Sequence, residues 1–311
     1  MKRRLMGIGL LALLLLTILI SASCASISTG NKIAVIPLSG PITTGGTFSL
    51  FGTTITPELV RTQLARAEDD SSVGAVVLQI DSPGGAVAPC QEILEEIGKI
   101  RQSKPVVVSM GNEAASGGYY ISAKADRIVA LPGTLTGSIG VIAQMPNVKG
   151  LYEKLGIEME TFKGGKYKDM YSGLRELTAE EKIIMQQLVD DYYEQFIDVV
   201  AEGRGLSKDK VRTLATGQLY TGAEAKESGL VDELGGLDTA IDLAAELAGI
   251  AAPKVEYYKH EPSLLESLLG MDLGDLANLA RMRLLGLDGQ DIVLLESLSH
   301  AYPQPQYLCG S

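Results

Sequence analysis

Residues 73–85 read Val-Gly-Ala-Val-Val-Leu-Gln-Ile-Asp-Ser-Pro-Gly-Gly. The near-continuous apolar run Val73–Ile80 is typical of a strand that is buried on both faces of a parallel sheet. Val106–Met110 has the same character, and between these two runs Pro89–Arg101 has helical spacing with its apolar residues on one face. Strand, helix and strand in this order predict right-handed βαβ units, and therefore an α/β fold with a parallel sheet.

The sequence on both sides of this unit continues the alternation of strands and helices. Thr178 and Glu181 form a capping box, which predicts the start of a long helix that runs to about Glu202. The other expected elements are strands at 33–38 and 127–130, helices at 57–68, 116–125, 221–229 (opened by a capping box of Thr221 and Glu224) and 238–249 (capped by Asp238), a loop at 43–54 and a turn at 111–115.

The composition is that of an acidic protein with a sizeable core. Of its 311 residues, 46% are hydrophobic, which is enough for one large domain or two modest ones. There are 38 acidic and 27 basic residues, and the resulting net charge of −11 argues against nucleic acid as a partner. Cys24, Cys90 and Cys309 form no C-x-x-C pair and no histidine cluster accompanies them, so we expect no metal site and no cofactor, and a buried free thiol at Cys90.

The first thirty residues predict export from the cytoplasm. Basic residues 2–4 precede the uncharged, leucine-rich run Leu5–Ile20, as in a secretory signal or an N-terminal anchor. The apolar stretch spans about 20 residues, which is just long enough to cross a bilayer. Three fates remain open: an uncleaved anchor, cleavage after the small residues at 21–23, or lipidation of Cys24. In each case the rest of the chain is expected at the extracytoplasmic face of the cell membrane.

The chain is expected to divide into three parts: a signal or transmembrane anchor (1–30), a body that carries the chemistry (31–250) and a C-terminal tail (251–311). Leucines between Leu264 and Leu284 recur at interrupted helical spacing. This pattern favours a packing face against a neighbouring subunit or the body over a lipid-binding helix.

Residues 112–120, Asn-Glu-Ala-Ala-Ser-Gly-Gly-Tyr-Tyr, are the strongest local indication of chemistry. Ser116 is flanked by small residues, so a substrate carbonyl could reach it, although a serine at a helix start is more often a simple N-cap. The pair Gly84-Gly85 ends the neighbouring predicted strand, where sites of parallel sheets form. The N–H groups of Gly85 and Gly117 are therefore predicted to form an oxyanion hole, helped by the positive end of the helix at Ser116.

A serine nucleophile also needs a base within hydrogen-bond reach. The histidines, His260 and His300, both lie far from this region of the sequence, which makes a Ser-His-Asp triad improbable. A lysine whose pKa is lowered by burial could replace histidine as the base. Lys163, Lys166 and Lys168 lie in a glycine-containing loop before the long helix, and their spacing alone does not choose between them.

Several spaced motifs together resemble the bacterial signal peptide peptidase A (SppA) family, which belongs to the Clp-protease/crotonase-like superfamily. The likeness covers about residues 32–250. The segments that carry it are Asp81-Ser82-Pro83-Gly84-Gly85, Ala115-Ser116-Gly117-Gly118-Tyr119, Leu135-Thr136-Gly137-Ser138-Ile139-Gly140, Lys168-Asp169 ahead of Arg175-Glu176-Leu177-Thr178, and Val231-Asp232-Glu233-Leu234-Gly235-Gly236.

The resemblance implies a Clp-protease/crotonase-like βαβ fold and a membrane-associated serine protease with a Ser-Lys catalytic dyad. Ser116 would be the nucleophile and Lys168 the general base, and Ser138 would hold the lysine amine through a hydrogen bond. The implied substrates are remnant signal peptides and other apolar peptides, which would add as a strand in a hydrophobic groove. Family members form ring- or dome-like homo-oligomers with sites between neighbouring subunits.

The sequence departs from the family in modest ways and leaves two other functions open. It is the short, single-repeat form, and Asp169 would raise the pKa of Lys168 if it turned inward, so we expect it to point away. The first alternative is a crotonase-type acyl-CoA enzyme, which the export signal and Ser116 disfavour. The second is a non-catalytic membrane scaffold, which intact Ser116 and Lys168 disfavour. Cleavage-site preferences, the oligomer number and the role of the tail do not follow from the sequence.

Overall fold

The computed structural model describes residues 30–44, 54–258 and 306–308. Almost all of the expected signal or anchor segment, most of the loop expected at 43–54 and the leucine stripe of the tail lie outside these residues. Within the described part of the chain, no helix combines the length and apolar character needed to cross a membrane.

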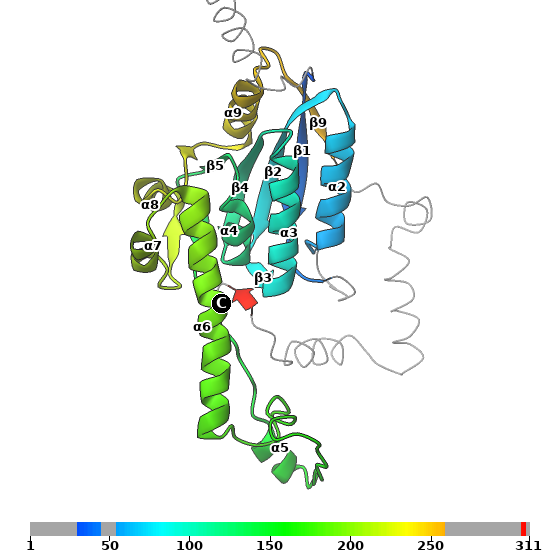
Figure 1. Cartoon of the computed structure of the whole chain (residues 1–311), viewed down its shortest axis with the longest axis vertical. Coiled ribbons are helices and arrows are strands. Elements are labelled where there is room, and N and C mark those ends of the chain that lie inside the picture. The colour runs from blue at the N-terminus through cyan, green and yellow to red at the C-terminus, as the bar shows by residue number, and fades with distance from the viewer. Residues whose placement is uncertain (1–29, 45–53, 259–305, 309–311) are drawn as a thin grey trace, which may run out of the picture.

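The described residues form an eight-stranded sheet whose pairings are all parallel except that of β6 with β7 (Figure 1). Its main path runs β7-β6-β4-β2-β1-β9, and β5 pairs with β4 and β8. The predicted α/β fold with a parallel sheet is thus confirmed. The strands are β1 (Lys32–Ser39), β2 (Val73–Ser82), β4 (Val106–Ala115), β5 (Arg127–Ala130), β6 (Leu135–Gly137), β7 (Leu219–Thr221), β8 (Glu233–Leu234) and β9 (Lys254–Tyr257).

Helices cover both faces of this sheet, which explains why its central strands are apolar on both sides. Alternate residues of β1, β2 and β4 pack against α2, α3, α4 and α6 on one face and against α9 on the other. The helices are α2 (Pro57–Asp69), α3 (Val87–Ile100), α4 (Gly117–Ser122), α5 (Lys149–Lys154), α6 (Ala179–Arg204), α7 (Lys208–Leu214), α8 (Gly222–Ser228) and α9 (Leu237–Ala248).

The turn predicted at 111–115 is wrong, because β4 continues to Ala115. Long-range pairing explains the difference: residues 113–115 pair with β6, and the Asp81 carboxylate accepts a hydrogen bond from the N–H of Glu113 at 3.0 Å. The helix expected over 116–125 is shorter and spans Gly117–Ser122.

Both predicted capping boxes are present, one at the start of α6 and one at the start of α8. The prediction that Asp238 caps α9 is wrong, since Gly236 occupies the cap position and Asp238 lies in the first turn. β9 lies within the residue range assigned to the tail, yet it extends the central sheet beside β1.

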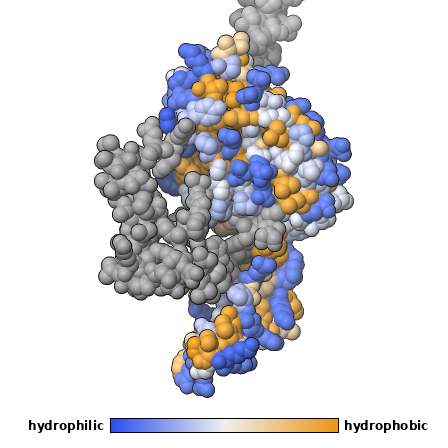
Figure 2. Space-filling view, turned by 180° about the vertical axis from the view of Figure 1, so that it is seen from behind, coloured by the Kyte–Doolittle hydropathy of each residue, from blue (hydrophilic) through white to orange (hydrophobic). Residues whose placement is uncertain are grey.

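Residues 141–191, which include α5 and the first half of α6, project from the body of the molecule, and we call them the arm (Figure 1). Apolar side chains are exposed on its outer end, as Figure 2 shows. They include Leu151, Leu155, Ile157, Met159 and Phe162, of which Phe162 is 92% exposed. A cavity of about 600 Å³ lies between the chain before α5 and the first turns of α6.

Candidate active site

Ser116 occupies the turn between β4 and α4 in a backbone conformation that is unusual for serine. Its φ is 52° and its ψ is −113°, a region that costs a non-glycine residue about 1–3 kcal/mol and that occurs most often at functional sites. The N–H of Ser116 donates to the carbonyl of Gly137 at 2.8 Å, which ties the turn to β6. Its hydroxyl is fully buried and has no hydrogen-bond partner among the described residues. The Ser116 hydroxyl is thus held in a fixed position at a strand-to-helix turn, without a hydrogen-bond partner among the described residues.

The two glycines predicted to form the oxyanion hole lie next to each other. A Cβ atom built on Gly117 would come within 2.9 Å of the backbone nitrogen of Gly85 and 2.8 Å of the Cys90 sulfur. A Cβ atom on Gly85 would come within 2.0 Å of the carbonyl oxygen of Ile42. Both positions therefore require glycine, because neighbouring backbone occupies the space that a side chain would need.

The N–H of Gly85 is directed away from Ile42. On the Ile42 side, the hydrogen bonds use the carbonyl of Gly84, at 2.8 Å, and the N–H of Ala86, at 2.9 Å. Since successive N–H groups of a strand point to opposite sides, the N–H of Gly85 faces the other edge of β3 (Gly84–Ala86). An extended segment, β10 (Gln306–Leu308), pairs antiparallel along β3 (Figure 1).

Cys90 is a buried free thiol, as predicted. Burial raises its pKa well above the usual range, so the thiolate is disfavoured. Its sulfur packs against Gly117, which indicates a packing role beside the turn at Ser116.

Ser138 lies beside the turn at Ser116, one residue beyond Gly137, whose carbonyl accepts the N–H of Ser116. It also has a positive φ, of 47°, and its side chain is buried. Its hydroxyl donates to the carbonyl of Gly217 at 3.3 Å, and its N–H donates to the carbonyl of Gln218 at 2.8 Å. The structure thus brings Ser138 together with Ser116, Gly85 and Gly117.

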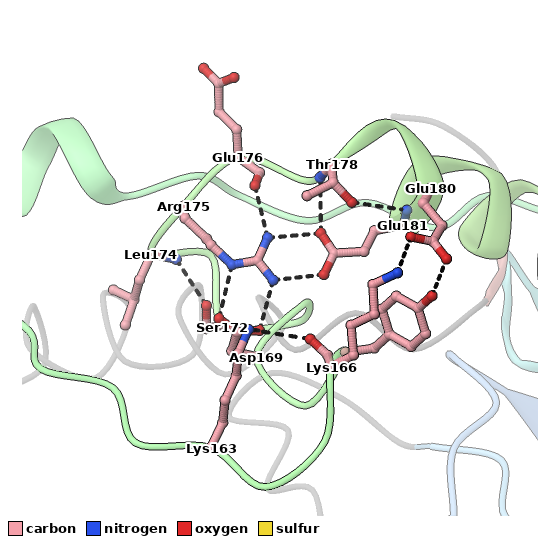
Figure 3. Close-up of polar contacts among 11 residues, drawn as sticks. Lys163, Lys166, Asp169, Ser172, Leu174, Arg175, Glu176, Thr178, Glu180 and Glu181 are labelled. Atoms are coloured by element: carbon pink, nitrogen blue, oxygen red, sulfur yellow. Dashed lines mark hydrogen bonds and ion pairs between the residues drawn. The ribbon is translucent and has the colours of Figure 1, made fainter.

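Lys168 lies on the arm and is exposed. An ion-pair cluster ties its loop to Glu181 in the first turn of α6 (Figure 3). The helix that follows Ser116, α4, contacts α6 closer to the C-terminal end of α6, where the rings of Tyr120 and Phe196 lie 5.1 Å apart. The fifteen residues from Glu181 to Phe196 correspond to about 22 Å along a helix. Within one chain, the structure therefore does not bring Lys168 to Ser116.

The three candidate lysines differ in their partners. Lys163 forms an ion pair with Asp169 at 2.7 Å, and Lys166 forms one with Glu180, which raises the pKa of Lys166 (Figure 3). The amine of Lys168 has no hydrogen bond or ion pair within the described residues. A general base must lose its proton readily, and an ion pair with a carboxylate opposes that loss. Of the three, Lys168 is the lysine whose amine is not committed to a carboxylate.

Asp169 is engaged by cations other than Lys168. Its carboxylate accepts hydrogen bonds from Arg175, at 2.7 and 2.9 Å, and from Lys163. These bonds hold the pKa of Asp169 well below its usual range. Sequence reasoning assigned no role to Arg175, which appeared only inside a family motif, because its partners depend on how the loop folds.

Comparison with known proteins shows which family the chain belongs to. The model of Peptidase family S49 matches residues 99–251. A Synechocystis protein provisionally named a protease is 43% identical over 229 residues, which are 74% of this chain and 79% of that protein. An Enterococcus faecium protein provisionally named signal peptide peptidase SppA is 36% identical over 287 residues, 91% of this chain and 82% of the relative.

Protease 4 of Salmonella typhi is 37% identical over 242 residues, which are 78% of this chain but 38% of that longer protein. The matched residues 99–251 include Ser116, Ser138 and Lys168. The chain belongs to peptidase family S49, the serine protease family of SppA and Protease 4.

Proposed function

We propose that this protein is a membrane-associated serine endopeptidase with a Ser116–Lys168 dyad that degrades remnant signal peptides and other apolar peptides at the extracytoplasmic face. The proposal includes a Clp-protease/crotonase-like version of the α/β fold. The observation that carries it is the buried, unpartnered hydroxyl of Ser116 in a strained turn beside Gly85 and Gly117. Membership of peptidase family S49 supports the same chemistry.

In the proposed mechanism, the neutral amine of Lys168 accepts the proton of the Ser116 hydroxyl as its oxygen attacks the peptide carbonyl. The N–H groups of Gly85 and Gly117 hold the oxyanion that forms, and one such donor contributes about 3–4 kcal/mol to transition-state stabilisation. The lysine then gives the proton to the leaving amine. Water, activated by the same amine, hydrolyses the acyl-enzyme. Ser138 would orient the lysine amine by accepting a hydrogen bond from it.

The edge of β3 that faces away from Ile42 supports a peptide substrate that binds as an added strand. An extended segment already pairs along this edge, with Tyr307 opposite Gly85. Such pairing supplies main-chain hydrogen bonds that do not depend on side chains, which suits an enzyme that acts on many apolar sequences.

The separation of the two dyad residues supports a homo-oligomer in which a neighbouring subunit supplies the lysine. Lys168 lies on the projecting arm, some 22 Å along α6 from the contact with α4. Exposed apolar side chains on the arm, among them Leu155 and Phe162, would be covered in such an assembly (Figure 2). Docking of the arm onto the next subunit would also remove Lys168 from solvent, and removal from solvent favours the neutral amine that a lysine base requires.

The first experiment is labelling with a serine-reactive fluorophosphonate, together with hydrolysis of a fluorogenic apolar peptide. We expect wild type to be labelled and active, and Ser116→Ala to be neither. Lys168→Ala should lose activity by at least about a hundredfold, because general-base catalysis contributes about 10²–10⁴. Equal labelling of wild type and Ser116→Ala would favour a non-catalytic scaffold. Binding of CoA to the purified protein would support the alternative function of an acyl-CoA enzyme.

The pH dependence tests the lysine separately. Only the neutral amine accepts a proton, so kcat should be low at acid pH and rise with pH as the amine loses its proton. A profile that is flat from about pH 6 to about pH 10 would exclude a lysine base.

A further inference from the structure

We infer that Arg175 is a positioning residue for the reaction: it fixes the loop of Lys168 to α6 and holds the Asp169 carboxylate away from the lysine amine. This inference rests on the proposed function, because it assumes that Lys168 is the general base.

Arg175 uses all five of its N–H groups in this loop (Figure 3). Nε and Nη2 donate to the two carboxylate oxygens of Asp169 at 2.9 and 2.7 Å. Nη1 and Nη2 donate to the two oxygens of Glu181 at 2.7 and 2.6 Å. The remaining N–H donates to the carbonyl of Glu176 at 3.0 Å. Two bidentate pairs on one guanidinium fix both direction and distance, which an ammonium could not do.

The Glu181 end of this cluster is anchored in the helix. The Glu181 side chain is 3% exposed and accepts the N–H of Thr178 at 2.9 Å, while Thr178 accepts the N–H of Glu181. The capping box and the arginine thus share one carboxylate. The loop that carries Lys168 is thereby tied to the rigid start of α6 by charged hydrogen bonds.

The Asp169 end of the cluster determines whether a negative charge lies next to the amine of Lys168. Asp169 follows Lys168 directly in the sequence, and a free carboxylate there would pair with the ammonium form and oppose loss of its proton. Arg175 and Lys163 occupy that carboxylate. The other charged groups around the loop are arranged separately: Lys166 and Tyr167 bind Glu180 from the first turn of α6, and Lys182 lines the cavity beside it.

The test compares the pH dependence of kcat in the full-length wild type and in Arg175→Met, which keeps much of the side-chain length but removes the charge. Asp169, then held by the partly exposed Lys163 alone, becomes available to Lys168. We expect the rise of kcat to move to higher pH by about one unit. At a pH below the rise, this shift corresponds to a roughly tenfold lower rate.

Asp169→Asn tests the same cluster in the opposite direction and keeps Arg175. It removes the negative charge but leaves two cations near the lysine, so the rise of kcat should move to lower pH. In Arg175→Met combined with Asp169→Asn, the rise should return to or below the wild-type pH, while kcat on the plateau stays reduced because the anchor to Glu181 is still missing.

Arg212→Met is the matched control, since it removes an exposed arginine–glutamate pair, with Glu194 of α6, that is not part of the loop. Its pH profile should coincide with that of wild type. If Arg175→Met and Asp169→Asn also coincide with wild type, the inference is wrong. If Arg175→Met does not fold, Asp169→Asn decides alone.

Failure of the proposed function gives a different pattern. A flat wild-type profile, or an active Lys168→Ala variant, would show that Lys168 is not the general base. The proposed function would stand, and only the role of Arg175 would be excluded, if kcat of the wild type rises with pH and Lys168→Ala is inactive, but Arg175→Met and Asp169→Asn show no shift of that rise.

Discussion

At the scale of single residues, the candidate site depends on backbone that approaches backbone more closely than side chains allow. Ser116 has a positive φ that strains a residue with a Cβ atom, and the surrounding hydrogen bonds to Gly137 and Tyr120 hold it there. Gly117 lies against the backbone of Gly85, and Gly85 lies against the backbone of Ile42, because neither glycine has a side chain. The position of the hydroxyl and the positions of the two proposed oxyanion donors thus depend on one set of backbone contacts.

Gly85→Ala should abolish this arrangement. The added Cβ would lie 2.0 Å from the carbonyl oxygen of Ile42 and 2.6 Å from its nitrogen, so β3 would have to move away from its neighbour. We expect kcat to fall by about 10²–10³, as for the loss of one oxyanion donor, and the melting temperature to fall as well. Peptide hydrolysis and thermal unfolding measure the two effects.

Gly98→Ala is the matched control. Gly98 lies within α3, and apart from the nearby backbone of that helix and the two adjacent residues, no atom of the described residues lies within 4 Å of a Cβ added there. Alanine in a helix interior is favoured over glycine by about 0.5–1 kcal/mol, so this variant should be slightly more stable and equally active. If Gly85→Ala were as active and as stable as Gly98→Ala, Gly85 would not be part of the active site.

At the scale of helices and strands, sequence patterns predicted the elements whose local periodicity is strong. The buried strands, α2, α3 and both capping boxes follow from residues that are neighbours in the sequence. The second half of β4 did not follow, because residues 113–115 become a strand by pairing with β6, which is twenty residues farther along. Three-residue strands such as β6 and β7 have no periodicity to recognise.

The site was predictable to a similar extent. Ser116, Gly85 and Gly117 stand where strands end and helices begin, and a parallel sheet brings such ends together. Spacing alone could not predict which lysine is the candidate base, because the three lysines differ in whether their amines form an ion pair with a carboxylate in the folded loop. The bidentate pairs of Arg175 arise from the folded loop and leave no pattern in the sequence.

Glu181 makes the start of α6 sensitive to acid. The hydrogen bonds from Arg175 and from the Thr178 backbone lower its pKa from 4.5 to about 2. A carboxyl group with a lowered folded-state pKa stabilises the fold above about pH 4.5 and loses that contribution as the pH falls to about 2. Glutamine can still occupy the capping box, so Glu181→Gln removes mainly the charge.

We therefore expect Glu181→Gln to be less stable than wild type at neutral pH, and the difference to close as the pH approaches about 2. Denaturant unfolding of both proteins at several pH values measures this difference directly. A gap that stayed constant down to that pH would mean that the ion pair with Arg175 does not stabilise α6.

At the scale of the whole molecule, the body and the arm divide the proposed chemistry between them. The body holds the nucleophile, the two glycines and Ser138 around the ends of β2, β4 and β6, whereas the arm carries Lys168 beyond them (Figure 1). The Arg175 cluster keeps the lysine loop on α6, so a small loop movement would not carry Lys168 back along the helix to Ser116. Under the proposed mechanism, a second copy of the chain would supply the base.

Mixed assemblies of two inactive variants test this directly. Ser116→Ala retains Lys168, and Lys168→Ala retains Ser116, so a site shared between neighbours regains both groups where the two variants meet. If subunits mix randomly in equal amounts, roughly a quarter of the sites contain both, and roughly a quarter of the wild-type activity should return. The variants must be co-expressed or dissociated and reassembled, and the double variant Ser116→Ala/Lys168→Ala mixed with either one should stay inactive. Absence of activity in assemblies verified to contain both variants would require each chain to supply its own base, and hence an arm that folds back onto the body.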